Sequence, residues 1–554
     1  MFSSDFTPKL FSLLRNGYNF SSLKADILAG LTVAIIALPL SMALAIASGT
    51  SPDKGLITAV IAGFFISFLG GSRVQIGGPT GAFIVVVFNV IAQHGYDGLI
   101  LATLVAGLIL IIAGYARFGQ IIKYIPHPVV TGFTAGIAVI IASSQIKDFL
   151  GLSISNIPAE FIDKWHSYFS HINTIDLTTL TVGLSSLLAI ILLKRLNPKL
   201  PGYLITVIIS SAVVYLGDFH IDTIGSRFPD IVAGIPMPTM PDWSIDKILD
   251  IIPVAFTIAF LAGLESLLSA MVADGMTGYK HRSNQELIAQ GIANIASAAF
   301  GGMPATGAIA RTATNIKSGG KTPVAGISHA IFILLFMLFA MDIIAFVPLA
   351  TLSAILFIVA WNMSETHHFL HILRLSKSDR TVMLLTFALT VLVDLTVAIG
   401  VGVTLASLLF IHEMSKSSVL RTQGRHRHDL DDTAEDETQR DDLPQGVEVF
   451  RLTGPIFFGV AGSLLDTLRA MDHIPSILIL RMKLVPYIDV AGLNALLQLL
   501  KDCQDKKTVI ILSGLQQQPA AILQKSGVED NQSTLRVTSS YEAAISLAEE
   551  LIEK

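Results

Sequence analysis

The chain has 554 residues, of which 52% are hydrophobic and only 14% are charged, and its mean hydropathy is +0.65. An ordinary soluble domain carries roughly 25% charged residues, so we expect most of this chain to be solvated by lipid. The small net charge of −5 and the lack of a basic stripe exclude nucleic acid as an expected partner, and the single cysteine, Cys503, excludes an internal disulfide and a cysteine metal cluster.

Residues 1–25 are predicted to form a cytoplasmic N-terminus. They carry Lys9, Arg15 and Lys24, and no small-residue cleavage site follows a short apolar stretch, so no removable signal peptide is expected. The first hydrophobic segment is therefore expected to remain in the membrane as an anchor.

Residues 26–413 are predicted to form a polytopic α-helical transmembrane domain with fourteen helices. Apolar segments of about 15 to 22 residues recur along this region, and each would cross or nearly cross a hydrocarbon core of about 30 Å. The predicted spans are 27–48, 55–69, 79–93, 99–115, 129–145, 177–193, 203–216, 251–271, 284–300, 305–317, 324–341, 349–361, 381–396 and 398–413.

The distribution of basic residues orients these spans, because cytoplasmic loops carry an excess of Lys and Arg. With the N-terminus inside, the predicted cytoplasmic loops hold Arg73, Arg117, Lys123, Lys194, Arg195, Lys199, Lys280, Arg282, Lys317, Lys321, Arg374, Lys377 and Arg380. The opposite loops hold only Lys54, Lys147, Lys164, Arg227 and Lys247. Both termini are therefore predicted to be cytoplasmic, in a multi-pass protein of the inner membrane.

Two stretches of the chain resemble each other. The sequences GLITAVIAGFFISFLGG (55–71) and ELIAQGIANIASAAFGG (286–302) align without gaps, and a proline followed by Thr-Gly-Ala comes soon after each, at 79–82 and at 304–308. The copies fall seven predicted helices apart, which inverts the second relative to the first. A 7+7 inverted repeat is typical of secondary transporters.

The predicted third and tenth spans begin with these proline motifs, which cannot continue a preceding helix but can start a new one. We expect two half-helices that start inside the membrane, with their free N–H groups and positive dipole ends facing a cavity that holds an anion. The alternative interpretation is a simple loop whose glycines allow close helix packing.

Two ionisable residues and one serine are the other candidates for this cavity. Glu265 lies in the middle of a predicted span, where a carboxylate must be protonated, paired or bound to a cation, so it is either a coupling site for H⁺ or Na⁺ or a structural partner. Arg311 follows the second motif and either contacts the substrate, pairs with Glu265 or marks the cytoplasmic side. Ser41 follows Pro39, which either opens the backbone toward the cavity or only kinks the helix.

The composition changes after Glu413. Residues 414–445 are predicted to be a flexible charged linker, because Arg421–Asp442 is polar and lacks apolar periodicity. Residues 446–554 alternate short β-branched runs, starting at Val447, Ser476, Thr508 and Thr534, with helical patterns. This alternation predicts an α/β domain.

The motifs resemble the SulP family of anion permeases over nearly the whole chain. The matching stretches are DILAGLTVAIIALPLSMALAIASG from Asp26, GGSRVQIGGPTGAF from Gly70, YIPHPVVTGFTAGI from Tyr124, LESLLSAMVADGMTGYKHRSNQEL from Leu264 and TGAIARTATNIKSGGKTPVAG from Thr306. The resemblance implies a core domain (predicted helices one to four and eight to eleven) that moves against a gate domain (five to seven and twelve to fourteen). It also implies a cytoplasmic STAS domain over 446–554 and a homodimer.

The resemblance also assigns roles to individual residues. It implies substrate contacts at Thr80, Gly81, Ala82, Ala305, Thr306, Gly307 and Arg311, with Ser41 as a further candidate. Glu265 falls where sodium-coupled bicarbonate relatives carry an aspartate, and a glutamate there resembles the dicarboxylate branch and favours H⁺. The STAS phosphorylation motif is replaced by Asp489-Val490-Ala491-Gly492, so Ala491 excludes regulation by phosphorylation of a serine at that position.

The function predicted from these features is proton-coupled uptake of C4-dicarboxylates such as succinate, fumarate or aspartate. The alternatives are a sulfate or bicarbonate permease coupled to H⁺ or Na⁺, an uncoupled anion channel, and a membrane-anchored signalling scaffold, against which the paired half-helices argue. No enzymatic activity, cofactor or metal is expected. The expected partners are a small anion, the coupling ion, membrane lipid, a second copy of the chain and a cytoplasmic regulator of the STAS domain.

Overall fold

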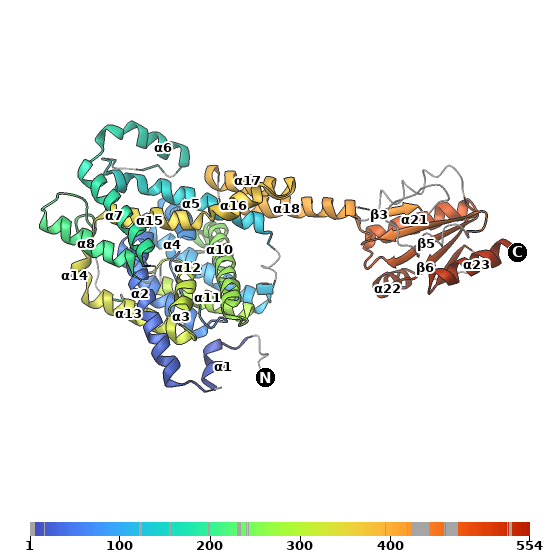
Figure 1. Cartoon of the computed structure of the whole chain (residues 1–554), viewed down its shortest axis with the longest axis horizontal. Helices are drawn as coiled ribbons and strands as arrows, with labels where there is room; N and C mark the ends of the chain where they lie inside the picture. Colours follow the sequence, from blue (N-terminus) through green and yellow to red (C-terminus); the bar gives the residue numbers. More distant parts are fainter. Residues whose placement is uncertain are drawn as a thin grey trace. The chain divides into compact units, whose positions relative to one another are not determined.

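The computed structural model describes residues 6–15, 17–120, 125–154, 157–158, 160–197, 200–229, 234–239, 241, 243–393, 395–417, 419–422, 443–458, 460, 475–528, 530 and 534–553. The chain divides into two compact units, Met1–Ala406 and Ser407–Lys554. The first unit is helical and the second is an α/β domain (Figure 1).

The first unit consists mainly of α-helices. In chain order these are α1 (Lys9–Arg15), α2 (Phe20–Ala47), α3 (Pro52–Leu69), the 3₁₀ turn η2 (Gly81–Phe83), α4 (Ile84–Tyr115), α5 (His127–Leu150), α6 (Phe161–Ser170), α7 (Leu177–Leu196) and α8 (Gly202–Leu216). The later helices are α9 (Ile224–Arg227), α10 (Ile245–Thr277), α11 (Ser283–Ala299), α12 (Ile309–Lys317), α13 (Pro323–Phe339), α14 (Met341–Ile344), α15 (Leu349–Met363), α16 (Thr366–Leu373), α17 (Lys377–Leu392) and α18 (Leu395–Ser417).

Every predicted span overlaps one of these helices. Spans 79–93 and 99–115 both lie on α4, which departs from helical geometry at Gly95, where φ is 69° and ψ is −176°. Among the described residues, eight helices are long and apolar enough to cross a membrane, and α8 and α13 are shorter apolar helices. The count of fourteen therefore stays a prediction, whereas the mostly helical membrane domain is confirmed.

Carboxylate side chains, one local and one from a distant part of the chain, bind the N–H groups where two helices start. Asp176 accepts hydrogen bonds from the N–H groups of Thr178 and Thr179, 3.2 and 2.9 Å long, at the start of α7. The buried carboxylate of Asp26 on α2 accepts the N–H groups of Lys321 and Thr322, 2.7 and 3.1 Å away, just before α13 begins. This second cap ties the first predicted helix to the eleventh.

The helices of the first unit pack in two groups. One group joins α4 to α10 and α11, and α13 to α2 and α3, while the other joins α5 to α7, α15 and α17 and α7 to α15. In the first group, Gly107 and Gly291 allow α4 and α11 to touch, since a Cβ added at Gly291 would lie 2.5 Å from the Gly107 oxygen. The two groups contain the helices predicted for the core and gate domains.

The two proline motifs meet inside the first unit. Two short strands, β1 (Gly77–Gly78) and β2 (Thr306–Gly307), pair antiparallel, with Gly77 opposite Gly307 and Gly78 opposite Thr306. The two glycines just before Pro79 thus pair with residues of the second motif. Gly78 has φ of 149° and its missing side chain leaves room for Arg311, whose Nη1 would lie 2.5 Å from an added Cβ.

The second unit is a five-stranded sheet in the order β3 (Val419–Thr422), β4 (Val447–Thr453), β5 (Ile477–Leu484), β6 (Val509–Ser513), β7 (Leu535–Thr538). Strands β4 to β7 run parallel and β3 is antiparallel to β4. One apolar cluster contains side chains of α21 (Val490–Asp505) and α22 (Gln517–Lys525), and another contains those of α23 (Tyr541–Glu553). The four predicted strands and the α/β class are confirmed.

The boundary between the predicted domains differs from the observed elements. Helix α18 continues to Ser417, beyond the predicted end of the membrane domain at Glu413, and β3 lies inside the segment predicted as linker. The rest of that segment, 423–442, lies outside the described residues. The strand was missed because VLRT is short, and its pairing with β4 is a long-range contact.

Candidate functional site

A cavity of about 440 Å³ lies inside the first unit, where both motif copies meet the other helices. Its wall is mostly apolar and includes Ile36, Leu40 and Leu44 of α2, Phe133 and Ile137 of α5, Tyr203 of α8 and Leu261 and Leu264 of α10. The charged residues that line it are Lys194, Glu265, Arg311 and Glu365. A cavity of this size and composition is typical of a small-ligand site.

Two helix starts border this cavity. On one side Pro79, Thr80, Gly81 and Ala82 lead into η2 and α4, and Thr80 is extended, with φ of −130° and ψ of 161°. On the other side Ala308 is the N-terminal flanking residue of α12, and Ala308–Arg311 line the wall. Free N–H groups at such starts stabilise negative charge, so both motif copies favour an anion in this space.

Glu265 and Thr80 are in direct contact at the cavity. The Thr80 hydroxyl donates a hydrogen bond of 2.7 Å to Glu265 Oε2, which links η2 to the middle of α10. No ion pair joins Glu265 to Arg311 among the residues that the structure describes. Glu265 and Arg311 therefore line one cavity without a direct ion pair, and the alternative of a structural pair stays a prediction.

Arg311 is a buried cation with unused hydrogen-bond donors. Its side chain is 3% exposed, and Nη2 donates a hydrogen bond of 2.6 Å to the carbonyl oxygen of Pro79. Within the described part of the chain, Nε and Nη1 are buried and have no hydrogen-bond partner. Since an unpaired buried charge is costly, the free donors favour an anion beside Arg311.

The structure places the other predicted substrate contacts outside the cavity wall. The Thr306 hydroxyl donates to the Ala262 oxygen at 2.7 Å, and the N–H of Ala305 donates to Asn294 Oδ1 at 2.9 Å. Gly307 lies against Gln75, whose Nε2 would be 1.5 Å from an added Cβ. Ser41 is fully buried and does not line the cavity. The second copy therefore presents Ala308–Arg311, a few residues later than expected.

A buried carboxylate binds the backbone just after α3. Glu286 of α11 is 0% exposed, and its Oε2 accepts the N–H groups of Gly71 and Ser72, 2.8 and 3.1 Å away. Its Oε1 accepts the Ser266 hydroxyl at 3.1 Å and Gln290 Nε2 at 2.9 Å. Four donors thus surround one carboxylate, and one of them comes from the residue next to Glu265.

The same network continues to the second helix start. Gln75 Nε2 donates to the Ser266 hydroxyl at 2.8 Å, and the N–H of Ile76 donates to the Thr312 hydroxyl at 3.0 Å. The N–H of Ala308 donates to the Ile76 oxygen at 2.8 Å. These bonds connect the residues that neighbour Glu265 and Arg311, so they fix the spacing of the two charged side chains.

Sequence reasoning missed the cavity residues of the second helix group. Lys194 lies in the last turn of α7, and Asn362, Met363 and Glu365 lie at the end of α15 and just beyond it. Glu365 has φ of 40° and ψ of 44°, a left-handed conformation that is uncommon for a glutamate. These residues belong to no repeated motif, and only the packing of α7 and α15 brings them to the cavity.

A helical membrane domain with two facing helix starts around a buried cavity defines a membrane transporter. Residues 23–386 match the sulfate permease family and residues 441–544 match the STAS domain. The chain therefore belongs to the sulfate permease family, whose members are transporters rather than enzymes, and carries a C-terminal STAS domain.

Individual relatives agree with this family. The Bacillus subtilis (strain 168) protein named "Putative sulfate transporter YvdB" is 41% identical over 92% of this chain and 95% of its own length. The bicarbonate transporter BicA of Picosynechococcus sp. is 30% identical, with 92% of each chain covered. The structure of SLC26A9 superposes with a TM-score of 0.87 at 20% identity, covering 99% of this chain and 93% of that one, which shows the shared fold.

Proposed function

We propose that this protein is a secondary active transporter of a small inorganic anion, either sulfate or bicarbonate. The observation that carries the proposal is the Arg311 guanidinium, which is buried at the cavity with two nitrogens unpaired. An anion beside Arg311 would accept those donors and would also lie near the starts of η2 and α12.

The names of the relatives favour sulfate or bicarbonate over the C4-dicarboxylates expected from the sequence. Proteins at 41% and 30% identity are named for sulfate and for bicarbonate transport, and nothing in these relatives supports dicarboxylate specificity. The sequence-based expectation rested on a resemblance to the dicarboxylate branch of the family and on the glutamate at position 265. The relatives found by comparison, at 41% and 30% identity over 92% of the chain, are instead named for sulfate and bicarbonate.

Within this proposal the site residues take two kinds of role. The site residues that line the cavity would contact the anion. They are the predicted Thr80, Gly81, Ala82 and Arg311, and in addition Ala308. Ala305, Thr306 and Gly307 would position the second helix start through β2 and its hydrogen bonds. Ser41 would act only indirectly, since it is buried away from the cavity wall.

Glu265 is the residue that we propose for coupling to H⁺ or Na⁺. It lines the same cavity as Arg311, so a cation or proton on the carboxylate would remove negative charge beside the anion. Binding of the anion and of the coupling ion would then favour each other, because linkage is reciprocal. An uncoupled channel is the alternative, in which Glu265 would not affect accumulation.

The remaining expectations are part of the same proposal. The protein would work in the inner membrane with both termini in the cytoplasm, as a homodimer in which the core group of helices shifts against the gate group. An unidentified cytoplasmic regulator would act at the STAS domain. That domain cannot be phosphorylated at position 491, where alanine follows Asp489 and Val490 at the start of α21.

The test is a competition panel in proteoliposomes that contain the full chain. Uptake of labelled sulfate and bicarbonate is measured under an imposed H⁺ or Na⁺ gradient, with unlabelled sulfate, bicarbonate and succinate as competitors. We expect sulfate or bicarbonate to compete best, and Arg311→Met to abolish uptake while Lys317→Gln, at the exposed end of the same helix, retains it. Strongest competition by succinate, or normal uptake by Arg311→Met, would contradict the proposal.

A further inference from the structure

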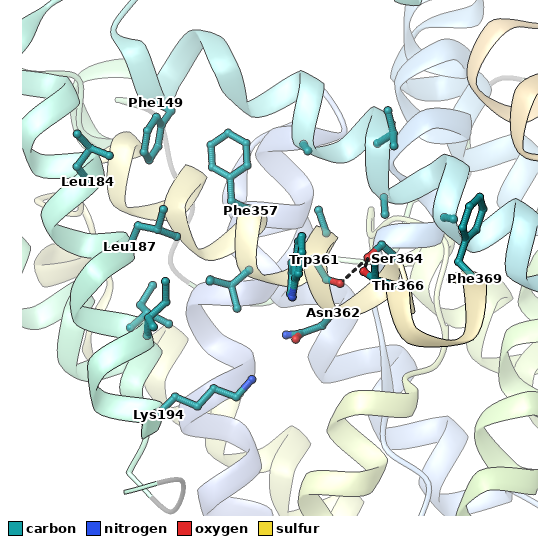
Figure 2. A pocket seen from close by; sticks show the side chains of 18 of the residues that line it. Phe149, Leu184, Leu187, Lys194, Phe357, Trp361, Asn362, Ser364, Thr366 and Phe369 are labelled. Atoms are coloured by element: carbon teal, nitrogen blue, oxygen red, sulfur yellow. Dashed lines mark hydrogen bonds between the residues drawn. The ribbon is translucent and has the colours of Figure 1, made fainter. Parts of the chain in front are cut away.

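A second, larger cavity lies between α5, α7, α15 and α17, with a volume of about 1160 Å³ (Figure 2). Its wall consists mainly of aliphatic and aromatic side chains: Ala135, Ala138, Val139, Ala142, Phe149, Leu184, Leu187, Ile190, Ile191, Phe357, Ile358, Ala360, Trp361, Phe369 and Phe387. Pockets for drug-sized ligands measure roughly 300–1,000 Å³, so this cavity suits an apolar molecule larger than an ordinary small ligand.

One wall of this cavity belongs to a helix that is poorly covered by protein. In α7 only 28% of the most apolar stretch is buried, compared with 61% in α2 and 67% in α5. Leu184, Ile191 and Trp361, which line the cavity, are 50%, 46% and 68% exposed. In a membrane protein such exposed apolar side chains face hydrocarbon, so the cavity is accessible from the lipid phase.

The polar residues of the cavity lie at the C-terminal ends of α7 and α15 and just beyond α15. Lys194 and Arg195, in the last turn of α7, line it together with Asn362, Ser364 and Thr366. Figure 2 shows Phe149, Leu184, Leu187 and Phe357 gathered on one side with Lys194 below them, and Ser364 and Thr366 between Trp361 and Phe369. The cavity therefore has the polarity of an amphipathic ligand.

The length of the cavity wall matches one leaflet of a bilayer. Leu184 and Lys194 are ten residues apart on α7, which corresponds to about 15 Å along the helix axis. This is about half of a hydrocarbon core of about 30 Å. An acyl chain that starts at the level of Lys194 would therefore end near the middle of the bilayer.

We propose that this cavity binds an anionic phospholipid. One acyl chain lies along α5, α7 and Phe357, and the phosphate group is bound by Lys194 and Arg195, with Trp361 at the level of the headgroup. Basic pockets between transmembrane helices bind anionic headgroups in this way, and tryptophan favours the membrane interface. A zwitterionic lipid would fill the apolar part but would carry no net charge for the two cations.

This lipid would act on transport through shared residues. Ile190, Lys194 and Asn362 line both this cavity and the cavity that contains Arg311. A phosphate bound at Lys194 would neutralise one of the two cationic side chains, Lys194 and Arg311, that line the cavity of about 440 Å³. The lipid site is thus coupled to the anion site, although its existence does not depend on which anion is transported.

The test is lipid binding to the purified full chain, measured by native mass spectrometry with added phosphatidylglycerol or phosphatidylcholine. We expect tighter binding of phosphatidylglycerol, and a loss of roughly tenfold to thirtyfold in its affinity in the double variant Lys194→Gln/Arg195→Gln. The control is Lys280→Gln/Lys317→Gln, which removes equal charge from exposed positions that line neither cavity. Equal binding of both lipids, or equal loss in the two double variants, would overturn the proposal.

A second measurement uses the unmodified protein and so does not depend on the stability of a variant. Vesicles contain phosphatidylglycerol with a photoreactive acyl chain, and the labelled peptides are identified after illumination. We expect labelling to concentrate on 184–191 and 357–361. Helix α8 is the internal comparison, because its exposed Ile208, Ile209 and Val213 also face hydrocarbon but do not line the cavity. Equal labelling of α8 would indicate ordinary boundary lipid and would refute the site.

Discussion

Thr80 donates a hydrogen bond of 2.7 Å to the carboxylate of Glu265, across 185 positions of the chain. The bond joins the first helix start to α10, so the proposed anion-contacting and coupling residues are in direct contact. A change in the charge of Glu265 is therefore transmitted to the residue that begins η2. This contact would be the structural basis of the coupling that we propose between the anion and the coupling ion.

We expect Glu265→Gln to separate exchange from accumulation. Glutamine keeps an oxygen that accepts the Thr80 hydroxyl, but it cannot carry a proton or a compensating cation. The variant should bind the anion and exchange labelled for unlabelled anion, and should lose accumulation driven by an ion gradient. The measurement is uptake into proteoliposomes with and without the gradient, beside counterflow at equal ion concentrations. Full gradient-driven accumulation by the variant would make Glu265 structural.

We expect Gly307→Ala to destabilise the protein rather than to act on the anion directly. The new Cβ would lie 1.5 Å from Gln75 Nε2, and Gln75 is held by Ser266 through bonds of 2.8 and 3.2 Å. Overpacking of this kind costs about 1–3 kcal/mol. Thermal unfolding in detergent should show the loss, and Gly275→Ala, where an added Cβ meets nothing within 4 Å, should show little.

The second variant Gly307→Ala/Gln75→Ala identifies the cause. Removing the Gln75 side chain removes the clash, so the pair should be more stable than Gly307→Ala alone. If Gly307 instead contacts the anion, Gly307→Ala will weaken anion binding in a protein of normal stability, and the change at Gln75 will not restore it.

The sequence predicted the helices and a helix start after each of the two motifs, because both depend on local signals. Apolar length indicates a membrane helix, and the prolines at 79 and 304 each come shortly before a new helix start, at Gly81 and at Ile309. At the second helix start we predicted that Ala305–Gly307 would contact the anion, whereas the residues that line the cavity are Ala308–Arg311. The reason is that Thr306 and Gly307 are used by strand β2, and its pairing with β1 is a contact between residues far apart in sequence.

Other parts of the site have no local signal. Lys194 is an ordinary basic residue at a helix end, and Glu365 lies in an exposed turn, so neither differs in sequence from a residue at a membrane boundary. The hydrogen bond from Thr80 to Glu265 and the four donors around Glu286 likewise depend on helix packing. Such contacts depend on tertiary structure and cannot be predicted from the spacing of residues in the sequence.

The single cysteine provides a pH-dependent test of the STAS domain. Burial on α21 raises the pKa of the Cys503 thiol to about 11. Only the thiolate reacts, so alkylation by a maleimide should be slow at neutral pH and should rise about tenfold per pH unit beyond pH 9. An exposed control, Asn494→Cys in the Cys503→Ala background, should level off near the ordinary thiol pKa. Levelling of Cys503 at the same pH would contradict the burial of this thiol.

The carboxylate of Glu286 should be needed for both stability and anion binding. Its two oxygens accept four hydrogen bonds, from Gly71, Ser72, Ser266 and Gln290, and a glutamine can accept on one oxygen only. In Glu286→Gln two buried donors lose their acceptor, which costs about 1–3 kcal/mol for each unsatisfied group. Thermal unfolding in detergent should show a loss of about 2–6 kcal/mol.

The hydrogen bonds of Glu286 also affect the spacing of Glu265 and Arg311, so the variant can be tested by anion binding as well as by stability. Because Ser266 neighbours Glu265 and connects through Gln75 toward Arg311, Glu286→Gln should raise the KM for the anion in the protein that remains folded. The control is Gln285→Leu on the same helix as Glu286, which removes one hydrogen bond of 2.8 Å to the Leu69 oxygen of α3 and should leave the KM unchanged. A Glu286→Gln protein with unaltered KM and only lower stability would show that the network supports folding without positioning the site.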